Sequence, residues 1–144
     1  MITRLVLAAA VAALGITAVV AQGDPIAARR AAMKAVGDQN RIATEIIEGK
    51  RAFNADEAKK VLATFNDSGT KLTPLFPDNS KTGDTNALPA VWENKADFNA
   101  KLAKFAADSK AAEAKVTSLD AFKAEMAEVR KNCGGCHQTY RKRT

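Results

Sequence analysis

Apolar side chains recur along this chain at intervals of three and four residues, and no stretch sustains a period of two. The first spacing places apolar residues on one face of an α-helix, whereas a period of two would indicate a β-strand. Clusters of Gly, Pro, Asn, Asp and Ser separate the apolar stripes. The pattern therefore predicts an all-α protein without a sheet. The four predicted helices span about residues 25–48, 54–72, 94–115 and 117–140.

The ends of these predicted helices carry capping residues. Pro25 is favoured at a first helical position, and Gly49 should end the first helix. Ser68 and Gly69 should weaken the last turn of the second helix. The stretch 73–91 holds three of the four prolines and is expected to be an irregular crossover with apolar anchors at both ends. Three capping boxes are predicted: Asn54 with Glu57, Asn94 with Asp97, and Thr117 with Asp120.

The first 21 residues differ from the rest of the 144-residue chain. A short basic start, an apolar run and small residues at 19–21 are typical of a secretory signal peptide, with a retained N-terminal anchor as the alternative. We therefore expect a signal peptide at 1–21, one domain at 22–144, export to the periplasm and no membrane span after cleavage. Loss of Arg4 leaves 21 basic residues against 16 acidic ones. These charges are interspersed and few aromatics accompany them, so no nucleic-acid partner is expected.

The C-terminal end carries the sequence Cys133-Gly134-Gly135-Cys136-His137, which is the attachment motif of a c-type haem. Residues at i, i+3 and i+4 share one helical face, so two thioethers and a proximal imidazole would meet one haem. A thioredoxin-like pair would require a βαβ context. A structural zinc site needs four ligands, and the chain has only two cysteines and one histidine. The motif therefore predicts one covalently bound haem c.

The predicted fourth helix continues its core stripe directly into this motif. A haem attached there should lie between helices, inside a bundle. Gly37, within the first helix, either marks close approach of a flat or bulky group or is a tolerated residue costing about 1 kcal/mol. The stripe of the fourth helix consists of Leu119, Phe122, Met126, Val129, Cys133, Cys136 and Tyr140.

Three features of the chain carry a family resemblance: the haem motif near the C-terminus, Arg141 four residues after the histidine, and the long connection between the second and third predicted helices. In these features the chain resembles the class II cytochromes c, the cytochrome c-prime family. Residues 29–34 (RRAAMK) and 75–78 (LFPD) are most similar to its low-spin, methionine-ligated branch. The resemblance implies an exported four-helix bundle with haem bound covalently near the C-terminus of the fourth helix. It also implies an iron ligand from a methionine of the first helix.

Met33 is the methionine that the sequence itself nominates as sixth ligand. Met1 is lost with the signal peptide, and Met126 lies on the same helix as His137, eleven residues earlier, so it cannot reach the opposite face of the haem. Methionine is a suitable soft ligand where no second histidine exists. The alternative is that Met33 only fills the core.

Arg29 and Arg141 complete the predicted cofactor-binding set. Arg29 begins the first helix where a haem propionate could emerge, although a solvated charge is the alternative. Arg141, with the two basic residues that follow it, would face the same site, favour an acidic partner or satisfy the last carbonyls of the helix.

These features predict a periplasmic one-electron carrier with His137 and Met33 as axial ligands. The alternative is a five-coordinate haem protein that binds nitric oxide or carbon monoxide. An enzyme is not predicted, because no second histidine is available for acid–base chemistry and no carboxylate pair stands out. Redox proteins are the expected partners, and a homodimer through the first two helices is an open alternative.

Overall fold

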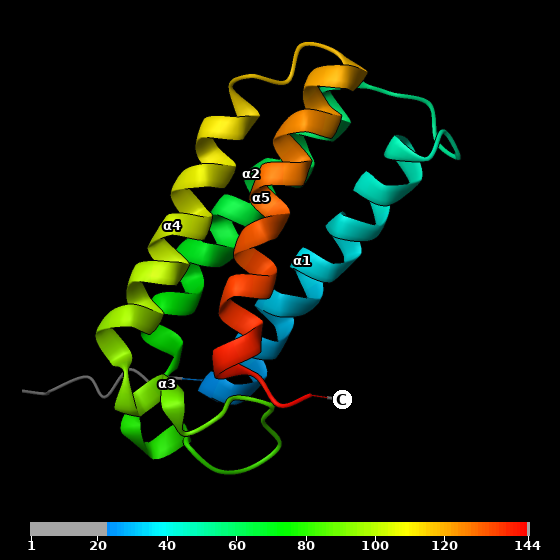
Figure 1. The fold of residues 1–144 in the computed structure, drawn as a ribbon. Coiled ribbons are helices and arrows are strands. Elements are labelled where there is room, and N and C mark those ends of the chain that lie inside the picture. The colour runs from blue at the N-terminus through cyan, green and yellow to red at the C-terminus, as the bar shows by residue number, and fades with distance from the viewer. Residues whose placement is uncertain (1–22, 144) are drawn as a thin grey trace, which may run out of the picture.

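The structure, a computed structural model, describes residues 23–143, so the signal peptide predicted at 1–21 lies outside the described residues. This range contains five α-helices and no strand. Four of the helices form a bundle, and the fifth, α3, is a single turn beside the crossover (Figure 1). The predicted all-α four-helix bundle is confirmed. The helices are α1 (Pro25–Ile47), α2 (Ala55–Leu72), α3 (Ala90–Glu93), α4 (Lys95–Glu113) and α5 (Leu119–Tyr140).

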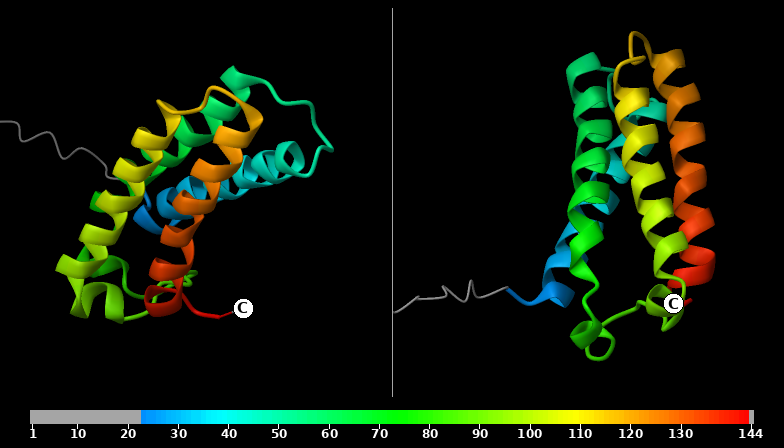
Figure 2. Two further views of the ribbon diagram at one scale, coloured as in Figure 1. Left: turned by 45° about the horizontal axis from the view of Figure 1, so that its top comes forward. Right: turned by 90° about the vertical axis from the view of Figure 1, so that its left-hand side faces the viewer.

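The crossover, residues 73–89, closes one end of the bundle and contains two 3-10 turns, Thr73–Leu75 and Asp78–Ser80. The first turn of α1 and the last turn of α5 lie at this same end (Figure 1). α2, α4 and α5 run nearly side by side, whereas α1 is inclined to them (Figure 2). None of the helices in residues 23–143 is long and apolar enough to cross a membrane.

The first two helices begin as their sequences predict. The Asp24 side chain accepts a hydrogen bond from the backbone N–H of Ile26 at 2.8 Å. The Asn54 side chain accepts one from the backbone N–H of Glu57 at 3.0 Å. Both bonds satisfy backbone donors that a helix start leaves without partners. Gly49 follows α1 with φ +73°, a left-handed conformation that glycine adopts without strain.

The starts of α4 and α5 differ from the predicted capping boxes. The Asn94 side chain makes no capping bond, and Asp97 accepts a hydrogen bond from the Tyr140 hydroxyl instead. At α5 the cap is Ser118, whose hydroxyl accepts from the backbone N–H of Ala121 at 3.2 Å, so Thr117 lies one residue too early. At α4 a long-range contact with Tyr140 engages Asp97. At α5 two adjacent hydroxyl residues could both cap, and Ser118 takes the position.

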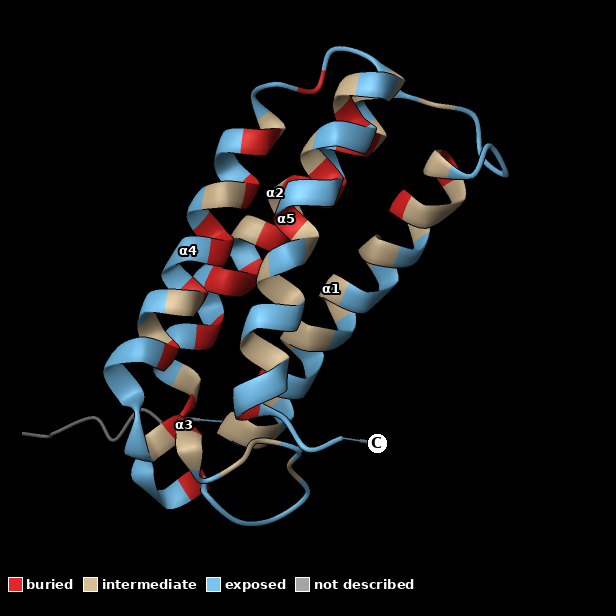
Figure 3. Cartoon of the chain, viewed as in Figure 1, coloured by how far each residue is buried: buried red, intermediate tan, exposed pale blue. Residues whose placement is uncertain are grey.

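Two core clusters lie along the bundle axis, with the buried positions turned inward (Figure 3). The far cluster, away from the crossover, is built on Ala43, Ile46, Ala58, Val61, Leu62, Phe65, Phe105, Ala112, Val116, Phe122, Met126 and Val129. The crossover cluster consists of Leu72, Phe76, Val91, Phe98, Leu102 and Tyr140. Full burial of a side chain such as Leu62 contributes about 1.5–3 kcal/mol.

α2 continues through Gly69 to Leu72, where the sequence predicts its end, so the weakening expected at Ser68 and Gly69 does not break the helix. Ser68 and Gly69 are both buried within a helix that continues to Leu72. A Cβ atom at Gly69 would lie 3.0 Å from Cδ1 of Phe105 and 3.1 Å from Cβ of Ala106. The glycine therefore allows α2 and α4 to pack closely, and packing between helices outweighs its poor helix propensity.

Candidate functional site

A cavity of about 540 Å³ lies between the two core clusters, within the range of about 300–1,000 Å³ that is usual for cofactor sites. All six members of the crossover cluster line it, and Phe65 of the far cluster lines it as well. All six residues predicted to bind the cofactor also line this cavity: Arg29, Met33, Cys133, Cys136, His137 and Arg141. The structure therefore brings residues from both ends of the chain to one site.

The motif occupies the last two turns of α5. Cys133, Cys136 and His137 are half-buried and line the cavity from one helical face. Burial raises the pKa of both thiols. Burial, assisted by the positive charge of Arg141, lowers the pKa of His137. The neutral imidazole that results is the form in which histidine binds a metal.

Met33 faces the cavity from α1 and packs beside the crossover cluster, as does Cys136. Met126 is fully buried in the far cluster and does not line the cavity. One turn beyond Met33, Gly37 also lines the cavity, and a Cβ atom there would meet no atom within 4 Å. The described part of the chain thus offers one thioether to this cavity, next to space left open by a glycine.

The residues present fit a haem c. Aromatic and aliphatic walls suit a flat apolar macrocycle, and the two thiols suit covalent attachment to it. Among the exposed charged residues that line the cavity, Arg30, Lys34 and Arg141 outnumber Asp84, with which Arg30 pairs, and two propionates would favour this excess of positive charge. Within residues 23–143 no group of three His, Cys, Asp or Glu side chains is arranged to hold a metal ion. The zinc alternative therefore gains no support from the fold.

Arg29 is buried, with 5% of its surface exposed, and is not the solvated charge considered as an alternative. Its Nη1 donates to the Ser80 hydroxyl at 2.9 Å, and its Nη2 donates to the Ser80 carbonyl at 2.9 Å and the Thr85 hydroxyl at 2.7 Å. The guanidinium also lies 4.8 Å from the ring centroid of Phe76 and 5.7 Å from that of Trp92. Burial lowers its pKa. Arg29 thus joins α1 to the crossover, and pairing with a propionate stays a prediction.

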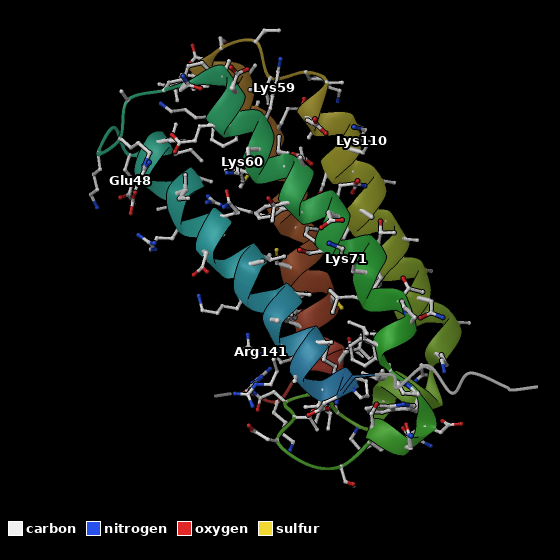
Figure 4. The ribbon with its side chains drawn as sticks, turned by 180° about the vertical axis from the view of Figure 1, so that it is seen from behind. Glu48, Lys59, Lys60, Lys71, Lys110 and Arg141 are labelled. Atoms are coloured by element: carbon white, nitrogen blue, oxygen red, sulfur yellow. The ribbon has the colours of Figure 1, made fainter. Side chains whose placement is uncertain are left out.

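Arg141 ends α5 and joins it to the crossover through the backbone. Its N–H donates to the carbonyl of His137 at 3.2 Å, and it forms an isolated β-bridge with Ala87. On either side of it, the N–H of Leu88 donates to the carbonyl of Tyr140 and the N–H of Lys142 donates to that of Asn86. Arg141 lies at the crossover end of the bundle, beside the first turns of α1 (Figure 4). This backbone pairing holds the helix end that carries the motif.

Tyr140 secures the same helix end through its side chain. Its hydroxyl donates to a carboxylate oxygen of Asp97 on α4, and its ring packs edge-on against Phe98 with centroids 5.2 Å apart. The hydrogen bond to Asp97 is the main reason that the pKa of Tyr140 rises to about 12. The sequence predicted only that Tyr140 belongs to the core stripe, because its partner lies 43 residues away.

Comparisons with known proteins agree with this site. The family model described as "Cytochrome C'" matches residues 24–141. A cytochrome c' of Rhodopseudomonas palustris is 38% identical over 139 residues, which cover 96% of this chain and 95% of that protein. A cytochrome c-556 of Agrobacterium tumefaciens is 34% identical over 114 residues, covering 78% and 93%. The solved structure of cytochrome c' from R. palustris superimposes with a TM-score of 0.82 at 38% identity, covering 85% of this chain and 99% of that one.

Proposed function

Because this chain belongs to the cytochrome c' family, we propose that it is a periplasmic one-electron carrier with His137 and Met33 as axial ligands. As a cytochrome of this family it binds haem c covalently. The bound haem supplies the redox chemistry, a one-electron exchange between ferric and ferrous iron. Cys133 and Cys136 would hold it through thioethers, and the neutral imidazole of His137 would bind the iron on the proximal side.

The observation that carries the proposal is that α1 and α5 bring Met33 and His137 to one cavity. The chain has no second histidine, and the other methionine of the described range is fully buried in the far cluster. The thioether of Met33 is therefore the soft ligand available on the distal side. A His/Met pair favours ferrous iron more than two nitrogen ligands do, and this raises the potential.

The protein's part in electron transfer is to exclude water and to keep both ligands in place in the two oxidation states. The apolar walls of the crossover cluster serve the first purpose, and rigid helices that carry the ligands serve the second. We propose a redox protein with an acidic surface as partner, since Arg141, Lys142 and Arg143 follow the motif. A homodimer through α1 and α2 stays the open alternative to a monomer.

A five-coordinate gas-binding protein is the second candidate. The observation in its favour is the open space at Gly37, beside Met33, which is itself only partly buried. Relatives named cytochrome c' and relatives named cytochrome c-556 both match, and neither name states the ligands of the iron. In this case Met33 would pack against the haem without binding it, and the distal side would accept nitric oxide or carbon monoxide.

The absorption spectrum of the purified ferric protein at neutral pH separates the two candidates. Methionine ligation should give a low-spin spectrum with a weak far-red band from charge transfer between sulfur and iron. Carbon monoxide should then bind the ferrous form poorly, because it must displace the thioether. A high-spin ferric spectrum without the far-red band would instead support the gas-binding function.

A further inference from the structure

The two helices that carry the proposed axial ligands, α1 and α5, are neighbours with few direct contacts. Arg130 on α5 bridges them. Its Nε donates to the side-chain oxygen of Asn40 at 2.9 Å, and its Nη2 donates to the hydroxyl of Thr44 at 2.8 Å and to the carbonyl of Asn40 at 3.4 Å. Within residues 23–143 these are the only hydrogen bonds between α1 and α5.

The position of this bridge along both helices is symmetrical. Arg130 lies seven residues before His137 on α5, and Asn40 lies seven residues after Met33 on α1. Seven residues are about two helical turns, so each bridging residue lies about 10 Å from its ligand residue along the axis and on nearly the same face. The two helices are antiparallel (Figure 1), so the bridge is displaced in the same direction from both ligand residues. Asn40 itself lines the cavity.

The cavity is therefore held at both ends. At the crossover end, Arg29 joins α1 to the crossover and Arg141 joins α5 to the same segment. At the inner end, Arg130 joins the two helices directly. A guanidinium donating to three oxygens allows little sliding, because its planar group of donors fixes direction as well as distance. Without Arg130, the spacing of α1 and α5 at this level would depend on apolar contacts alone.

We propose that Arg130 is a positioning residue that holds α1 and α5 at the spacing at which Met33 and His137 reach one iron. This proposal rests on the proposed His137–Met33 ligation. A ligand site requires its donor atoms to stay within about 0.5 Å of the productive geometry, and supporting residues provide that precision. Arg130 acts on the haem through Asn40 and Thr44, so its removal should loosen the bond to Met33 without removing any ligand.

The test compares two neighbouring substitutions in the haem-loaded protein, Arg130→Gln and Lys131→Gln. Each removes one positive charge from α5, but Lys131 is exposed, and within the described range it pairs only with Glu128 of the same helix, at 2.6 Å. We expect Arg130→Gln to weaken the far-red band. We also expect it to lower the dissociation constant for carbon monoxide about tenfold, since this constant scales inversely with the fraction of protein whose distal site is open. Lys131→Gln should match the wild type.

A second variant, Asn40→Ala, keeps the charge of Arg130 and removes the side-chain oxygen to which its Nε donates. It should reproduce the change in carbon monoxide affinity, and the double variant should show less than the sum of both effects, because the residues act as one unit. This variant also serves if Arg130→Gln fails to fold. A low-spin wild type whose carbon monoxide affinity neither Arg130→Gln nor Asn40→Ala changes would overturn the positioning role and leave the proposed function intact. A high-spin wild type would overturn both.

Discussion

Replacement of Met33 tests the proposed ligation most directly, and Met33→Leu is the most informative change. Leucine is close to methionine in volume and keeps the packing beside the crossover cluster, but it has no sulfur. Swaps of this kind usually cost less than about 1.5 kcal/mol of unfolding free energy. If Met33 binds the iron, Met33→Leu should convert the ferric protein to high spin, abolish the far-red band and lower the potential, because a ligand favouring ferrous iron is lost.

Met33→Ala separates ligation from packing. Loss of a buried methionine side chain costs about 2–5 kcal/mol of unfolding free energy, and the partial exposure of Met33 places the expected cost at about 2 kcal/mol. Both variants should therefore show the same change in spectrum and potential, whereas the alanine variant should melt at a lower temperature. The spectrum and the potential depend on the sulfur, which both variants lack. The melting temperature depends on the volume of the side chain, which mainly Met33→Ala reduces.

Met126→Leu is the matched control, since Met126 is fully buried in the far cluster and does not line the cavity. It should leave the spectrum and the potential unchanged. The measurements are a ferric spectrum, a potentiometric titration and a thermal melt of each purified holoprotein. A far-red band that survives in Met33→Leu would refute the ligation. So would a wild type without the band, in which both substitutions change only the melting temperature.

Three further predictions concern attachment, folding and pH. The double variant Cys133→Ala/Cys136→Ala should lose the haem-stained band on a denaturing gel, and a persistent band would exclude thioether attachment. The apoprotein, with an unfilled cavity of about 540 Å³, should be marginally stable by circular dichroism; a cooperative melt like that of the holoprotein would contradict this. The pKa of Tyr140 is raised from 10.0 to about 12, mainly by its hydrogen bond to Asp97, so the unfolded chain ionises first. The stabilisation is therefore complete below pH 10 and is lost as the pH rises toward 12. The difference in unfolding free energy between wild type and Tyr140→Phe should shrink over that range, and a difference independent of pH would disprove the reasoning.

Local features of the sequence determined the helices and the haem attachment site. The period of the apolar stripes predicts four long helices, and the Asn54 cap and the end of α1 at Gly49 follow from neighbouring residues. The motif needs only helical spacing to place Cys133, Cys136 and His137 on one face. These features depend on contacts within about one or two turns, and such contacts can be read from the order of residues.

Tertiary structure alone decided what the long-range polar side chains do. The sequence suggests a haem propionate or solvent as the surroundings of Arg29, yet its protein partners lie 46, 51 and 56 residues away in the crossover. Arg130 meets Asn40 across 90 residues, and nothing in its local sequence indicates that contact. The role of Gly69 also depends on tertiary structure. Glycine has a poor helix propensity, but the lack of a side chain at Gly69 lets α4 pack closely against α2. In each case the stabilising free energy comes from groups that only the packed bundle brings together, so the order of residues does not reveal the contact.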